Sequence, residues 1–73
     1  MDCIQLDGSL ATTAWTILTS LIQPGSLEDI ARNTNIPGHR IRPCLQELIN
    51  AGLVVENQGS YRITDIGLAL LNR

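Results

Sequence analysis

The side chains best suited to specific chemistry lie between positions 39 and 50 of the sequence. This stretch contains Arg40, Arg42, Gln46 and Asn50. In the major groove of duplex DNA, arginine makes paired hydrogen bonds to guanine edges, and glutamine and asparagine make them to adenine edges. The residue types therefore point to the recognition of base edges, provided that one element presents them on a common face.

An amphipathic helix over about residues 39–51 would present them in this way. Its apolar residues recur at i, i+4, i+7 and i+8, the spacing of one buried stripe: Ile41, Leu45, Leu48 and Ile49. Gly52 follows at the position of a C-terminal glycine cap. On a helical wheel the opposite face carries His39, Arg40, Arg42, Pro43, Gln46, Glu47 and Asn50.

Within this face, Arg40, Pro43 and Gln46 are the first candidates for base contacts, followed by Arg42 and Asn50. Proline is tolerated near a helix start, where a backbone N–H is not required. Pro43 therefore predicts a late start, at His39 or Arg40, which leaves the proline in the first turn or just past it.

Several of these residues also have plainer interpretations. Arg40 and Arg42 also fit as ordinary solvated charges, and His39 as a simple helix-start residue. Glu47 is expected on a solvated flank, because a carboxylate near phosphates is repelled. Two further arginines complete the predicted DNA-binding set: Arg32, late in the preceding helix, where it reaches a phosphate or does nothing, and Arg62, the only cation in the hairpin.

Two helices are predicted before this one. The first begins near Leu10 with Ser9 as its N-cap and ends at Pro24-Gly25. Ser26 opens the second with a run close to a capping box. Asn33-Thr34-Asn35 closes it, since asparagine tolerates the left-handed conformation of a helix end.

A hairpin and a short helix are predicted to follow. Residues 53–55 form an apolar run with two β-branched valines, 56–59 supply turn residues, and 60–63 return as the second strand. Thr64 is suited to cap a last helix over 65–72. We therefore expect a mostly helical α+β fold, a winged helix-turn-helix, with an N-terminal arm or short strand over 1–8 and the domain over 9–73.

Three stretches carry a resemblance to a known superfamily. The run 45–54 resembles the "Leu-x-x-Leu-x-x-x-Gly-Leu-Val" end of a winged-helix recognition helix. The run 61–71 resembles the "Tyr-x-Leu-Thr-x-x-Gly-x-x-Leu-Leu" segment that closes the wing in MarR-like and PadR-like transcriptional regulators, and 26–31 resembles their second helix. The resemblance covers about residues 10–73 and implies that the third helix docks in the major groove.

Size and composition limit the other classes of function. The chain has 73 residues, a formal net charge of -2, five arginines, no lysine and 3% aromatic residues. Scarce aromatics disfavour a single-strand nucleic-acid binder, and the charge disfavours indiscriminate binding. One histidine and no nucleophile motif predict no enzyme, no metal site, no cofactor and no small-molecule substrate.

The two cysteines, Cys3 and Cys44, have neither a C-x-x-C arrangement nor zinc spacing. They are expected to be reduced thiols of a cytoplasmic protein without a membrane span or secretion signal. A redox sensor is the alternative, since Arg40 and Arg42 lie close to Cys44 in sequence.

The sequence thus predicts a small, sequence-specific, double-stranded DNA-binding regulator. The alternative is a winged-helix module that mediates protein–protein contact, which the net negative charge favours. Four arginines limit a monomer to a shallow salt dependence of DNA binding, so a homodimer through the first and last helices is expected.

Overall fold

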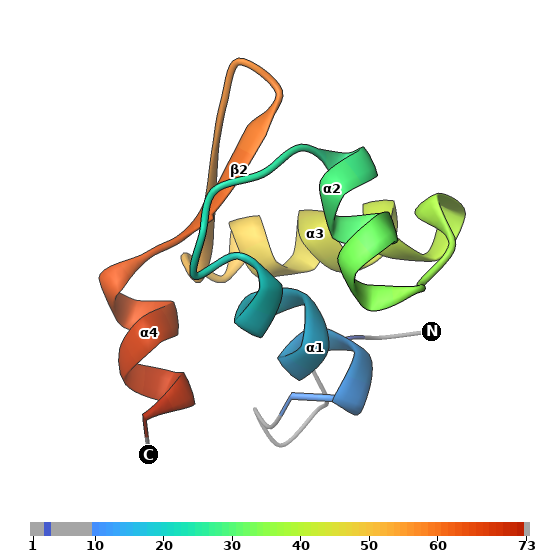
Figure 1. The fold of residues 1–73 in the computed structure, drawn as a ribbon. Helices are drawn as coiled ribbons and strands as arrows, with labels where there is room; N and C mark the ends of the chain where they lie inside the picture. The colour runs from blue at the N-terminus through green and yellow to red at the C-terminus, as the bar shows by residue number, and fades with distance from the viewer. Residues whose placement is uncertain (1–2, 4–9, 73) are drawn as a thin grey trace.

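The computed structural model describes Cys3 and residues 10–72. Four helices and two strands follow one another (Figure 1) as α1 (Thr12–Ser20), α2 (Leu27–Thr34), α3 (Gly38–Asn50), β1 (Val54–Asn57), β2 (Ser60–Ile63) and α4 (Asp65–Leu71). Three helices pack together, and an antiparallel hairpin and a short helix follow. This is a winged helix-turn-helix, as the sequence predicted. The expected boundary between positions 8 and 9 lies outside the described residues.

Helix α1 is shorter than the sequence pattern suggested. It begins at Thr12 with Ala11 as its N-cap and no side-chain cap bond; Ser9, the expected cap, lies outside the described residues. The helix ends at Ser20, well before Pro24, because the next segment pairs with the wing. Gly25 and Tyr61 exchange backbone hydrogen bonds of 3.0 and 2.7 Å.

Helix α2 has the predicted ends. Ser26 Oγ accepts the Asp29 N–H at 3.2 Å, and Asp29 Oδ2 accepts the Ser26 N–H at 3.1 Å, which completes a capping box. At the other end, Asn35 adopts a left-handed conformation with φ 59°. The turn into the next helix is therefore encoded locally.

Helix α3 starts earlier than predicted, and this corrects the position of Pro43. The helix begins at Gly38, so Pro43 lies inside it, in the second turn, without an N–H to donate to the His39 carbonyl. The side chains of Ile41, Leu48 and their neighbours on the same stripe are buried and hold the helix in place. Packing of this stripe outweighs the local cost of the proline.

The wing is a tight hairpin. Val54 pairs with Ile63 and Asn57 with Ser60, so the ladder continues through residues that the sequence assigned to the turn. Gln58 and Gly59 form the two-residue connection with φ 53° and 82°. Positive φ at both positions matches the twist of the flanking strands, which is why so short a turn suffices.

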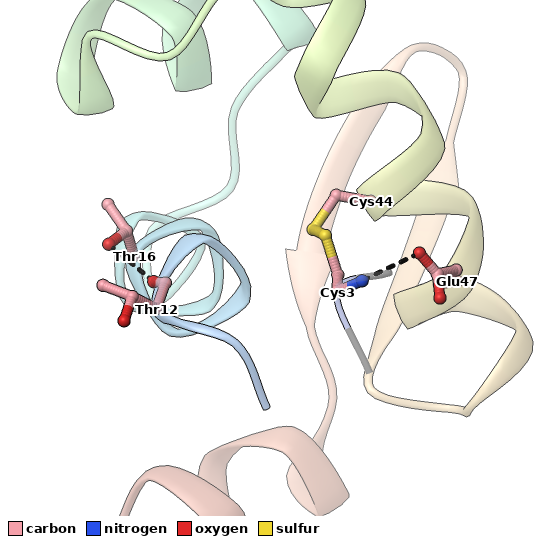
Figure 2. Close-up of a disulfide and its surroundings, with 5 residues drawn as sticks. All are labelled: Cys3, Thr12, Thr16, Cys44 and Glu47. Atoms are coloured by element: carbon pink, nitrogen blue, oxygen red, sulfur yellow. Dashed lines mark hydrogen bonds between the residues drawn. A yellow bond between two sulfur atoms is a disulfide. The ribbon is translucent and has the colours of Figure 1, made fainter. Parts of the chain in front are cut away.

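A disulfide joins Cys3 to Cys44, so the expectation of two reduced thiols is wrong for this structure. The two Cα atoms are 5.3 Å apart although 41 positions separate them in sequence. This spacing lies in the normal range for a disulfide, and it arises only when the chain folds. Figure 2 shows the bond between the arm and α3, with the Cys3 backbone N–H donating to Glu47 Oε2 at 3.0 Å.

None of the helices within the described residues has the length and apolar character needed to cross a membrane. In the same part of the chain, no cluster of three or more His, Cys, Asp or Glu side chains is arranged to hold a metal ion.

Helix α4 packs closely because of Gly67. Thr64 caps this helix: its Oγ1 accepts the Gly67 N–H at 3.1 Å and donates to the Gly52 carbonyl at 2.7 Å. A Cβ on Gly67 would lie 2.6 Å from the Leu53 carbonyl oxygen and 2.7 Å from Ile63 Cγ1. The glycine therefore allows α4 to lie directly against the base of the wing.

We expect Gly67→Ala to lower the free energy of unfolding by about 1–3 kcal/mol, although alanine favours helix more than glycine does. Gly38→Ala is the matched control: a Cβ there meets nothing within 4 Å, so this variant should gain about 0.5–1 kcal/mol. Urea unfolding of both variants measures the difference. Equal stabilisation by the two substitutions would contradict the close approach of α4.

The capping box makes a second prediction. The Ser26 backbone N–H, then the Ser26 side chain and the Arg32 cation hold the pKa of Asp29 below its ordinary value of 3.8. Because the folded pKa is lowered, this contribution to stability is present above about pH 4 and is lost as the pH falls through the folded pKa.

Ser26→Ala should raise the pKa of Asp29 part of the way towards its ordinary value, because the Ser26 side chain is lost while the backbone N–H remains, and it should cost about 1 kcal/mol of stability. Carboxyl-detected NMR titration gives the pKa, and thermal unfolding gives the stability. Thr16→Ala removes an exposed hydroxyl that bonds only to its own helix, at the Thr12 carbonyl, and serves as the control. An unchanged pKa of Asp29 in Ser26→Ala would argue against the capping box.

Candidate nucleic-acid interface

One face of α3 is uncovered by the rest of the described chain. The buried side of the helix consists of Ile41, Cys44, Leu45 and Leu48. Six of the seven residues that the sequence placed on the outward side are exposed, and the seventh, Glu47, is half-buried instead of solvated. The exposed six are His39, Arg40, Arg42, Pro43, Gln46 and Asn50. The hairpin extends away from the end of α3 (Figure 1).

The predicted side chains divide between the two edges of this face. On the wing side, Arg42 and Gln46 line a hollow of about 410 Å³ together with Glu56 and Tyr61, with apolar side chains such as Ile49 beneath. The hollow is open and amphipathic. The hollow lies between α3 and the wing, and an extended polar chain such as a sugar–phosphate backbone fits its open shape.

On the arm side, His39, Arg40 and Pro43 line a smaller hollow of about 160 Å³ with Cys3 and Thr13. The helical period places Pro43 and Gln46 in the middle of the outward face, with Arg40 and Arg42 on opposite edges. The α3 candidates therefore form one continuous face, with its two arginines at its borders.

Gln46 and Asn50 are linked to each other before any ligand arrives. Gln46 Nε2 donates to Asn50 Oδ1 at 3.1 Å, one helical turn away. This bond does not use the Gln46 carbonyl oxygen, an acceptor, or the Asn50 amide N–H groups, which are donors, and both residues are exposed. Such a pair matches the donor and acceptor pattern of an adenine edge.

The structure does not bring Arg32 and Arg62 together with the α3 face. Arg32 lies 3.7 Å from Asp29 in an exposed ion pair on α2. Arg62 pairs across the hairpin with Val55, and both line a hollow with Pro24 on the face of the wing that points away from Glu56 and Tyr61. The roles predicted for these two arginines stay predictions.

Two carboxylates border the face: the sequence predicted Glu47 on its flank, although as a solvated group, and did not predict Glu56 there. Glu47 is half-buried and is held by the Cys3 N–H, a contact between residues 44 positions apart that no local pattern signals. Glu56 faces α3 because it pairs with Tyr61, and the alternation of the hairpin strands would have revealed it. The α3 face is thus less positive than its arginines alone suggest.

Among solved structures, BpsR of Bordetella bronchiseptica has a similar fold; that structure concerns the regulation of its DNA binding by 6-hydroxynicotinic acid. The TM-score is 0.82 and the sequence identity is 22%, over 94% of this chain and 55% of that one. This chain therefore spans just over half the length of the BpsR chain, and at this identity the likeness concerns the fold. No protein-family model matches the chain, and neither does any curated protein.

Proposed function

We propose that the protein binds double-stranded DNA with α3 in the major groove and acts as a small transcriptional regulator. The observation that carries the proposal is the uncovered polar face of α3 beside the wing. The width of an α-helix suits the major groove of B-form DNA. The similar fold of BpsR, a protein whose DNA binding is regulated, supports the same assignment.

In this proposal the residues in the middle of the α3 face contact base edges, and the residues at its borders contact the DNA backbone. Gln46 and Asn50 contact an adenine edge as a preformed pair, and Pro43 packs against an apolar base edge such as a thymine methyl. Arg40 and Arg42, at the two borders, bind guanine edges or phosphates. His39, near the start of α3, contacts a DNA phosphate in this proposal.

Arg32 and Arg62 contribute backbone contacts at a distance from α3, the first from α2 and the second from the outer face of the wing. With all four arginines engaged, the slope of log affinity against log salt is about -3 to -4 for one domain, and about -2 if only the α3 pair takes part. A single domain therefore binds weakly at physiological salt.

A homodimer would double these contacts, and α4 offers a surface for it. This helix packs against α1, yet Ile66 is 65% exposed and Leu68 is 38% exposed. A second copy of the chain bound to this surface of α4 would double the DNA contacts. The two α3 helices of such a dimer would lie about 34 Å apart, in successive major grooves. We therefore propose a two-fold dimer through α1 and α4.

Titration of the isotope-labelled protein with random duplex DNA at about 20 mM salt tests the proposal. We expect chemical-shift changes in residues 38–50 and in the wing, because these elements face the groove and the backbone. The absence of any shift at this salt concentration would exclude duplex DNA as the ligand.

The four arginines provide a graded test of the geometry. Arg42→Gln and Arg40→Gln should each lower affinity and reduce the salt slope by about 1, whereas Arg32→Gln and Arg62→Gln should have smaller effects. Fluorescence anisotropy at several salt concentrations measures both quantities. The reverse ranking would move the interface away from α3.

Glu56 supplies the opposite charge test. We expect Glu56→Gln to tighten binding by about threefold, because its carboxylate shares the hollow with Arg42 and repels phosphate. Asp65→Asn makes the same change of net charge at the exposed first residue of α4, away from α3, and serves as the control once sedimentation shows that its oligomeric state is that of the wild type. Equal effects of the two variants would show that only net charge matters.

Sedimentation equilibrium tests the dimer. The protein should be dimeric at micromolar concentration, and Ile66→Asp should make it monomeric by placing a charge in the apolar contact. Val55→Asp introduces the same charge on the outer face of the wing and should leave the dimer intact. A monomeric protein at high micromolar concentration would overturn this part of the proposal.

A second candidate function is a protein-binding winged helix. The observation that favours it is the pair of carboxylates, Glu47 and Glu56, at the borders of the α3 face. In that case the same face would contact a partner protein with basic side chains. The DNA titration separates the two functions, because a protein-binding module shows no response to duplex at low salt.

A further inference from the structure

Cys3, the one arm residue that the structure describes, lies at one edge of the α3 face. Cys3 is bonded to Cys44 through the disulfide, and its N–H donates to Glu47 Oε2 at 3.0 Å (Figure 2). Its carbonyl accepts the Ala11 N–H at 2.9 Å. Two of these three links join the arm to α3, and one of the two is covalent.

The arm determines where the charge of Glu47 lies. Its carboxylate is half-buried against Cys3 on the arm side of α3 and accepts a backbone N–H there. The hydrogen bond holds the Glu47 carboxylate in a fixed position at the edge of α3. There it lies away from the phosphates of a bound DNA duplex. Without Cys3 in place, the same side chain would be free to swing towards the exposed residues near His39 and Pro43.

We propose that the redox state of the Cys3–Cys44 pair controls DNA affinity through Glu47, a step that rests on the proposed function. In the oxidised protein the disulfide keeps Cys3 beside α3, and its N–H holds the Glu47 carboxylate at the edge. In the reduced protein no covalent bond holds Cys3 beside α3, so Glu47 loses its fixed donor and its charge repels the DNA backbone.

The switching reaction is a thiol–disulfide exchange with a cellular dithiol as the reductant. One thiolate of the dithiol attacks the Cys3 sulfur, and the Cys44 thiolate leaves and takes up a proton. The second thiol of the reductant then attacks the mixed disulfide, which releases the Cys3 thiol and leaves the reductant as a disulfide. Two electrons and two protons pass from the dithiol to the two cysteines.

Of the two bonded cysteines, Cys3 lies nearer to solvent among the described residues. Cys44 is fully buried, but Cys3 is 5% exposed and lines the hollow of about 160 Å³ that it shares with Thr13 and Pro43. The reductant thiolate therefore attacks the Cys3 sulfur, and the Cys44 thiolate, buried in the core, is the leaving group.

The test is a double-mutant cycle between redox state and Glu47. Duplex affinity is measured by anisotropy at low salt for the wild type and Glu47→Gln, each oxidised and each reduced with dithiothreitol. We expect reduction to weaken the wild type by about three- to tenfold and to weaken Glu47→Gln by less than about twofold. Asp65→Asn, which makes the same charge change at the exposed first residue of α4, should respond to reduction as the wild type does, with sedimentation to check that its oligomeric state is unchanged.

The fold of the reduced protein is checked by circular dichroism and amide NMR, and also in a Cys3→Ala, Cys44→Val variant that fills the core without a disulfide. This variant should be folded and should bind as weakly as the reduced wild type. Unfolding of both forms would overturn the proposal, because the bond would then serve stability alone. An equal effect of Glu47→Gln in the two redox states would also overturn it. Failure of the oxidised protein to bind any duplex would instead refute the proposed function.

Discussion

The burial of one stripe of α3 is the constraint on which the rest of the structure depends. Ile41 and Leu48 are fully buried and Leu45 is nearly so, in a core shared with α1 and α2. Fixing this stripe also fixes which side chains face outward. The buried stripe also explains why α3 tolerates Pro43 in its interior, since packing of an amphipathic face contributes more to helix stability in proteins than local propensity does. The site is therefore a consequence of the core.

The wing is held to the same core from two sides. Its strands bring Val54 and Ile63 into the core, and the segment after α1 pairs with β2 at Tyr61. At its base, Gly67 lets α4 lie against the Leu53 carbonyl. The hairpin thus stands at a set distance from α3, and this distance creates the hollow into which Glu56 projects. The charge around the α3 face therefore depends on the position of the wing, which carries Glu56, as well as on the residues of α3.

Local sequence signals determined the order and nature of the elements. The capping box at Ser26, the left-handed Asn35 and the apolar stripe of α3 act within a few residues of each other, so they can be identified without tertiary information. The exposed candidates on α3 follow from the same helical period. Boundaries were less predictable: α1 ends early because residues near Gly25 pair with the wing, which no local pattern reveals.

Only the tertiary structure decided which distant residues meet. The disulfide between Cys3 and Cys44 and the hydrogen bond from Cys3 to Glu47 join positions more than 40 residues apart. The hairpin register likewise turned Arg62 away from α3. The sequence by itself established a winged helix with a polar outward face on its third helix, because those features depend on short-range periodicity. The distribution of charge around that face depends on long-range contacts, which exist only once the core has formed.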